Sequence, residues 1–245
     1  MATECLFRDD AYLRACSATV SSVTDEGRLI LDRTVFYATS GGQPGDRGVL
    51  VGTSGVHIPI AGALYTDAAK ADVVHVLAEG APVRPAVGEA IAVSIDWPLR
   101  YARMRMHTAL HLLSAVLPYK VTGGAVGETE SRLDFDIPEA GLDKDEITAK
   151  LNEMIATDAE VRTSWIRDEE LAANPGLVKT MSVQPPSGTG RVRLVEIVGL
   201  DIQPCGGTHV RRISEIGAVR VTQIEKKGKL NRRVRLALVP DAPPS

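Results

Sequence analysis

The chain has 245 residues, 44% of them hydrophobic and 24% charged, with a formal net charge of −3, which excludes a disordered or fibrous protein. No apolar run approaches the roughly 20 residues of a membrane-spanning helix, and the first residues are acidic where a signal peptide is apolar. Three cysteines, an odd count, are typical of a reducing compartment. We therefore expect a soluble, cytoplasmic protein with one large or two small domains.

The first part of the chain is predicted to form strands. Short β-prone runs at residues 29–31, 35–37, 73–77 and 91–95 are separated by clusters of Gly, Asp, Pro and Ser. This spacing is typical of a small barrel or sandwich. We therefore predict an N-terminal β-barrel domain at residues 1–95.

The pattern changes at Asp96, which is a good helix N-cap, and Pro98 falls in the first turn, where its missing N–H costs little. Apolar side chains then recur at helical spacing until Pro118, at Met106, Leu110, Leu113 and Leu117. A second helix is predicted at residues 143–157, with Ile147, Leu151 and Ile155 on one stripe. Strands are predicted at residues 191–198, 218–225 and 233–239. Helices and strands interleaved without a regular βαβ repeat predict an α+β fold. Its second domain, at residues 96–245, would pack helices on an antiparallel sheet.

Two short motifs carry metal-binding side chains. His107 and His111 are four residues apart and share one helical face beside the apolar stripe. Cys205 and His209 are also four apart, but the two glycines between them favour a tight turn over a helix. One thiolate and three imidazoles suit Zn²⁺. We predict that these four residues form a zinc site; the alternative is that both pairs lie in ordinary packing.

The ligand set leaves the role of the zinc open. Four protein ligands close a tetrahedral site, whereas a catalytic zinc keeps one position for water or substrate. Thr108 stands where the His-Glu-x-x-His motif has its general base, which disfavours a zincin-type peptidase. No side-chain base is identified, so catalysis would rest on a zinc-bound water, or on help from a substrate group.

A glycine-rich stretch at residues 39–48 interrupts the β-domain. Its glycines surround Pro44, and such a loop exposes backbone N–H groups that can cradle an anion or a ligand amide. The spacing fits neither the phosphate-binding P-loop nor the dinucleotide fingerprint. An ordinary barrel loop is the alternative interpretation.

The mild net charge hides an asymmetry. Residues 211–235 hold nine basic and two acidic residues, a net charge of +7 that leaves −10 for the rest of the chain. Segregated positive charge is typical of a surface that binds a polyanion, and a solvated basic hairpin is the alternative.

Taken together, these motifs resemble the AlaX family, the free-standing relatives of the editing domain of alanyl-tRNA synthetase. The resemblance rests on residues 107–113, 205–210 and 37–46, and it extends from about residue 31 to residue 238. A β-barrel joined to an α/β editing domain corresponds to the medium-length type. No ATP-binding synthetase core is present in this chain, so aminoacylation is not expected.

The resemblance implies a function and a set of site residues. Medium-length members hydrolyse the ester of serine, and sometimes of glycine, on mischarged alanine tRNA. The zinc ligands would be His107, His111, Cys205 and His209. The glycine-rich loop would lie near the substrate through Thr39, Gly41, Gly42, Gln43 and Asp46, with Thr39 contacting the seryl hydroxyl. The basic segment would bind tRNA phosphates without base readout, through Arg211, Arg212, Lys226, Lys227, Lys229, Arg232 and Arg233.

Two other functions remain open at this point. One is a zinc-stabilised tRNA-binding module without turnover, whose fold would be lost when the metal is chelated. The other is a zinc hydrolase that acts on a different amino-acid ester or amide.

Overall fold

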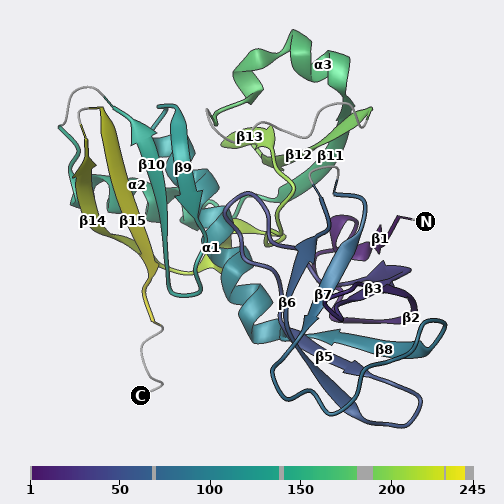
Figure 1. The fold of residues 1–245 in the computed structure, drawn as a ribbon. Coiled ribbons are helices and arrows are strands. Elements are labelled where there is room, and N and C mark those ends of the chain that lie inside the picture. The colour runs from purple at the N-terminus through teal and green to yellow at the C-terminus, as the bar shows by residue number, and fades with distance from the viewer. Residues whose placement is uncertain (1, 68–69, 138–140, 181–189, 229, 241–245) are drawn as a thin grey trace. The chain divides into compact units, whose positions relative to one another are not determined.

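The computed structural model describes residues 2–67, 70–137, 141–180, 190–228 and 230–240 (Figure 1). The chain divides into two compact units, Met1–Tyr101 and Ala102–Ser245, and the boundary lies inside helix α1 (Trp97–Val116). The predicted division at residue 95 stays a prediction. Within the described ranges, no helix has the length and apolar character needed to cross a bilayer.

The first unit is built around a closed six-stranded barrel. Its strands follow the order β2-β3-β7-β6-β5-β8 and pair antiparallel. Their bounds are β2 Ala15–Val23, β3 Leu29–Leu31, β5 Gly48–Val51, β6 His57–Tyr65, β7 Val73–Leu77 and β8 Ala90–Ile95. Along β8 the side chains of Ile91, Val93 and Ile95 are buried and alternate with exposed ones, as a strand with one face on a core requires. A parallel pair, β1 (Glu4–Cys5) with β4 (Arg33–Thr34), and a 3-10 helix at Leu6–Arg8 complete the unit.

The prediction of a strand at residues 35–37 is wrong. These residues are buried but irregular, because their backbone groups bond to side chains in place of a neighbouring strand. The Tyr37 N–H donates to Asp46 Oδ2 (2.7 Å), and the Val35 carbonyl accepts from Arg100 (2.7 Å). Asp46 and Arg100 form an ion pair with both side chains buried. Contacts with the buried Asp46–Arg100 ion pair thus take the place of strand pairing in this segment.

Helix α1 begins and ends as the sequence predicts. Asp96 Oδ1 accepts the Leu99 N–H at 3.2 Å, and the helix stops two residues before Pro118. Met106, Leu110, Leu113 and Leu117 are all buried, so the predicted apolar stripe faces a core.

The second unit holds two antiparallel sheets and the remaining helices. One sheet has the order β14-β15-β10-β9 and the other β11-β12-β13. The strands are β9 Val121–Ala125, β10 Glu130–Asp136, β11 Val161–Arg167, β12 Arg191–Ile197, β13 Asp201–Pro204, β14 Val219–Lys227 and β15 Asn231–Leu238. The helices are α2 (Lys144–Ala156), α3 (Asp168–Ala173) and 3-10 helices at Pro175–Leu177 and Ile213–Ile216.

Helix α2 covers the edge strand β14. Asp143 caps its N-terminus by accepting from the Asp145 and Glu146 N–H groups, and its buried stripe is the predicted one, Ile147, Leu151 and Ile155. The Asn152 side chain bonds to both the N–H and the carbonyl of Val219 on β14, so an edge that would otherwise be open is satisfied. The predicted α+β class, with a small N-terminal barrel and helices on an antiparallel sheet, is confirmed.

Candidate metal centre

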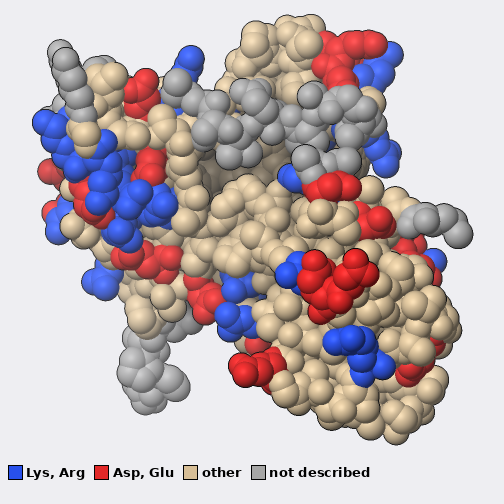
Figure 2. Space-filling model, viewed as in Figure 1, with Lys and Arg blue, Asp and Glu red and all other residues tan. Residues whose placement is uncertain are grey.

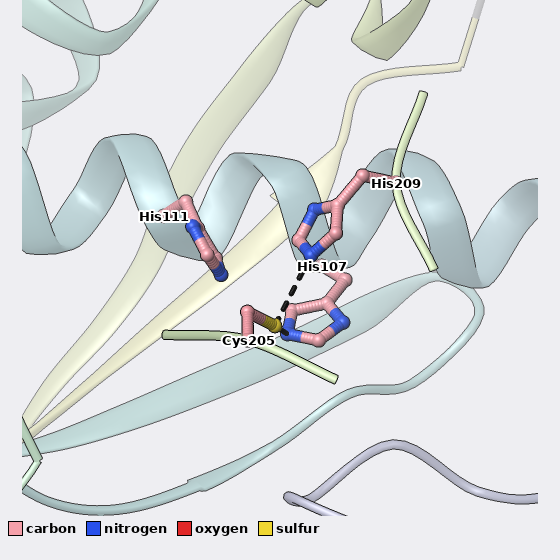
Figure 3. Close-up of side chains that lie close together, drawn as sticks. All are labelled: His107, His111, Cys205 and His209. Atoms are coloured by element: carbon pink, nitrogen blue, oxygen red, sulfur yellow. Dashed lines mark hydrogen bonds between the residues drawn. The ribbon is translucent and has the colours of Figure 1, made fainter. Parts of the chain in front are cut away.

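Four side chains gather in the second unit, as the motifs predict (Figure 3). His107 and His111 lie one turn apart on α1, while Cys205 and His209 belong to the turn that follows β13. The nitrogen and sulfur atoms that each residue can offer a metal all lie within 4.8 Å of one another. The three histidines are buried and Cys205 is partly buried.

The spacing of these atoms fits a tetrahedral zinc. Cys205 Sγ lies 3.6 Å from His107 Nε2 and 3.3 Å from His209 Nε2. A tetrahedral site with Zn–S near 2.3 Å and Zn–N near 2.0 Å separates neighbouring sulfur and nitrogen ligands by about 3.5 Å. The observed distances therefore need little change to accept the ion.

The remaining ring nitrogens of two histidines are already engaged. Thr108 donates its hydroxyl proton to the Met104 carbonyl (2.9 Å), so its oxygen is the acceptor for His209 Nδ1 at 3.1 Å. His111 Nδ1 lies 3.2 Å from the carboxylate of Asp201. A proton held on Nδ1 leaves the Nε2 lone pair toward the cluster, and such outer partners orient metal ligands in known sites.

The contacts within the cluster shift the pKa of Cys205, His209 and His111. Burial alone would raise the pKa of the Cys205 thiol, but the surrounding imidazoles of His107, His209 and His111 hold it well below its usual range. Burial lowers the pKa of His209 to about 3, reinforced by the neighbouring His107. Burial likewise opposes the charged form of His111, yet Cys205 and Asp201 raise its pKa to about 9. Metal binds to a thiolate and to neutral imidazole rings, so Cys205 and His209 already have the binding form, whereas His111 must lose its proton to bind.

Two residues that contact the centre were not predicted from the sequence. Asp201 and Gln203 are buried on β13, and Gln203 Nε2 donates to Asp201 Oδ2 (2.8 Å) and lies 3.2 Å from Ser114 Oγ on α1. Cys205 directly follows β13 and continues its pairing with β12 through the bond to the Arg193 carbonyl, so residues 201, 203 and 205 share one face. Counting back from Cys205 in steps of two gives Gln203 and Asp201, and this spacing is the signal in the sequence that identifies them.

A buried arginine fixes the turn that carries Cys205. Arg193 on β12 donates through one guanidinium nitrogen to the carbonyls of Cys205 (2.9 Å) and Gly207 (3.0 Å). The Gly207 N–H in turn lies 3.4 Å from Cys205 Sγ. The sulfur is therefore held by the backbone of its own turn, and that turn is held by the sheet.

The predicted substrate loop lies in the first unit. Gly41 and Gly42 are exposed and adopt positive φ angles of 57° and 83°, which glycine tolerates without strain. The exposed Thr39 accepts the Gly45 N–H (2.8 Å) and donates to the Ala63 carbonyl (3.2 Å). Gln43 and Asp46 are buried, and Asp46 serves the ion pair with Arg100. The substrate-binding role of these five residues stays a prediction.

The predicted tRNA-binding residues differ in their surroundings. Lys226 and Arg211 are exposed, whereas Arg232 is buried, and Lys229 lies outside the described residues. Other basic residues are paired: Arg233 with Asp134 (2.8 Å), Arg212 with Asp158 (2.7 Å) and Lys227 with Glu225 (2.7 Å). Figure 2 shows the resulting surface, where basic side chains gather over β14 and β15 with acidic ones among them. Asp134 and Asp158 lie outside the basic segment and offset part of its +7 charge, which already includes Glu225.

Comparison with known proteins identifies the family. The model of the threonyl and alanyl tRNA synthetase second additional domain matches residues 192–235, which include Cys205 and His209. The model of class II (A) tRNA synthetases matches residues 11–99.

Relatives match over nearly the whole chain. The alanyl-tRNA editing protein AlaX-M of Methanosarcina barkeri is 36% identical over 97% of this chain and 99% of its own length. AlaX-M of Saccharolobus solfataricus is 32% identical over 97% of this chain and 100% of its own length. The alanine–tRNA ligase of Pyrobaculum calidifontis is 32% identical over 90% of this chain but only 25% of its own length. The chain therefore belongs to the AlaX family of alanyl-tRNA editing proteins, and to its AlaX-M type.

Proposed function

We propose that this protein is a zinc-dependent aminoacyl-tRNA deacylase that removes serine, and also glycine, from mischarged alanine tRNA. The observation that carries the proposal is the buried cluster of His107, His111, Cys205 and His209, whose possible ligand atoms all lie within 4.8 Å of one another. Family membership supports the substrate class, because the relatives are named alanyl-tRNA editing proteins.

The chain's own residues would prepare the site for ester hydrolysis. Zinc, when bound, polarises an ester carbonyl and lowers the pKa of a water molecule. Asp201 and Thr108 hold the rings of His111 and His209, and Arg193 holds the turn that carries Cys205. The carboxylate of Asp201 also bonds to Lys179 and Gln203. These bonds fix the carboxylate beside His111, so it would orient that ring. An aminoacyl ester is already activated, so positioning and stabilisation of negative charge carry most of the catalysis.

Selection of serine over alanine requires a group that recognises the seryl hydroxyl. A site built to hydrogen-bond a hydroxyl rejects a substrate that lacks it far more strongly than an apolar pocket does. Thr39 is our proposed group: a hydroxyl oxygen accepts two hydrogen bonds, and the Gly45 N–H supplies one of them. The seryl hydroxyl would supply the second.

The test is a deacylation assay with zinc measured on the same sample. Purified protein is incubated with seryl-tRNA and alanyl-tRNA of the alanine acceptor, and we expect serine to be released much faster. Cys205→Ala should lose both zinc and turnover, while Cys16→Ala, at another partly buried cysteine, should keep both. Equal release of serine and alanine would refute the editing function, and activity in a zinc-free Cys205→Ala sample would refute the metal's role.

A second candidate is a zinc-stabilised tRNA-binding module without turnover. It is favoured by the ligand set itself, since four protein ligands are typical of structural zinc sites. Such a module would bind tRNA and unfold when a chelator removes the zinc. Circular dichroism of the chelated protein separates the two functions, because the deacylase is expected to keep its fold and lose only activity.

A further inference from the structure

An exposed tryptophan lies on the sheet that carries the metal centre. Trp165 belongs to β11, an edge strand of the sheet β11-β12-β13, and is 40% exposed. The Cζ atom of Arg191 on β12 lies 4.5 Å from the centroid of its ring. A large aromatic surface left in water beside a guanidinium group is typical of a binding site for a flat ligand.

Strand register places this ring in line with Cys205. Trp165 pairs directly with Arg193 across β11 and β12, and the Cys205 N–H bonds to the Arg193 carbonyl at 3.1 Å. Residues directly opposite each other in an antiparallel pair point to the same face. Trp165, Arg193 and Cys205 thus form a row across the strands. With strands about 4.8 Å apart, the row spans roughly 10 Å from Trp165 to Cys205.

We propose that Trp165, with Arg191 beside it, stacks the base of the terminal nucleotide that carries the aminoacyl ester. This inference rests on the proposed deacylase function, because it places the ester at the metal centre. Only a ribose separates the ester carbonyl from its base, so an unpaired base must then lie within a short distance of Cys205. The row of residues places one exposed aromatic ring at such a distance.

Stacking suits this position better than base-specific recognition. Every base has a π-face, so one ring gives affinity without sequence preference, and an arginine adds a cation–π contribution. The low aromatic content of the chain, 4%, argues against a platform for many bases, but a single terminal base needs a single ring.

Fluorescence tests the contact without requiring turnover. The chain has two tryptophans, so Trp97→Phe leaves Trp165 as the reporter. We expect uncharged tRNA to quench its emission, and tRNA lacking the 3′-terminal adenosine to quench it much less at equal occupancy. Equal quenching by both RNAs would overturn the proposal. Emission that changes with protein concentration but does not respond to tRNA would also overturn it, because the exposed face of Trp165 would then serve self-association.

Kinetics provides the second arm. Loss of one stacked base corresponds to about a 10-fold weakening of binding, so Trp165→Ala should raise KM for seryl-tRNA about 10-fold with little change in kcat. Trp165→Phe should keep most of the affinity, and Thr163→Ala, at an exposed position on the same strand face, is the matched control. An inactive wild-type protein would refute the deacylase function. Active wild-type protein with an unchanged KM in Trp165→Ala would overturn the stacking alone.

Discussion

Asp201 contacts the candidate metal centre through one ring nitrogen of His111. Its carboxylate lies 3.2 Å from His111 Nδ1 and is buried with that ring. Burial opposes its ionisation, but the bonds to His111, Lys179 and Gln203 lower the pKa of Asp201 to about 2. The group is therefore a carboxylate near neutral pH. A carboxylate behind a ligand histidine raises the basicity of the ring and fixes its orientation.

Asp201→Asn should weaken zinc binding about 10- to 100-fold, because the amide keeps the shape but loses the charge behind His111. The measurement is competition for zinc against a chelator of known affinity. Asp134→Asn is the control, since Asp134 lies on β10 and pairs with Arg233. Equal zinc affinity in Asp201→Asn and wild-type protein would show that Asp201 does not tune the ligand.

Helices with a clear periodicity of apolar residues were predicted well from the sequence, whereas buried polar contacts were not. The two long helices follow from their apolar stripes, and the first also from its cap Asp96. The Asp46–Arg100 pair joins residues 54 positions apart, and nothing local in the sequence indicates that it replaces a strand at residues 35–37. The four candidate metal ligands could be predicted because their residue types are rare and their spacings short. Thr108 as a partner of His209 depends on a tertiary contact across 101 positions.

The barrel contains a buried histidine that the proposed chemistry does not use. His75 on β7 is fully buried, with Nε2 2.8 Å from Thr34 Oγ1 and Nδ1 3.3 Å from the Leu29 carbonyl. The Phe36 ring packs edge-on against the imidazole, with 5.2 Å between the two ring centroids. Burial lowers the pKa of His75 to about 4, and the bond to Leu29 opposes this only partly. The folded barrel therefore holds His75 neutral.

This burial predicts a loss of stability in acid. The unfolded chain protonates His75 near pH 6.5 and the folded chain only near pH 4, so the unfolded state binds more protons between these values. The contribution of His75 to the free energy of unfolding is fully present above pH 6.5. It is lost as the pH falls to 4, which lowers the free energy of unfolding by about 3 kcal/mol. Urea unfolding of wild type and His75→Gln between pH 7 and pH 4 isolates the contribution of His75 to stability, because all other titratable groups are present in both proteins. Parallel stability curves for the two proteins would contradict the prediction.

The charge distribution of the molecule bears on how it binds tRNA. The segment at residues 211–235 carries +7 in a chain of net −3, a sum that includes Glu225, and the carboxylate of Asp134 from outside the segment contacts one of its cations. Arg233 donates from two nitrogens to both oxygens of Asp134, at 2.8 and 3.0 Å. Arg235 bonds to Glu225 and Glu130. Lys226, in contrast, is exposed at the end of β14. Arg233 and Arg235 are therefore held in ion pairs across the sheet, whereas Lys226 faces solvent.

Two substitutions that remove the same charge should then differ in their effect on tRNA binding. Lys226→Gln should weaken binding and reduce the slope of log affinity against log salt by about 1, because one phosphate contact is lost. Arg233→Gln should change that slope less, since Asp134 already neutralises the guanidinium group. The measurement is a titration of uncharged tRNA at several salt concentrations. Both variants lower the net charge by one, so each is the other's control. Equal losses would show that tRNA responds to the net charge of the surface, and would contradict a contact made by Lys226 itself.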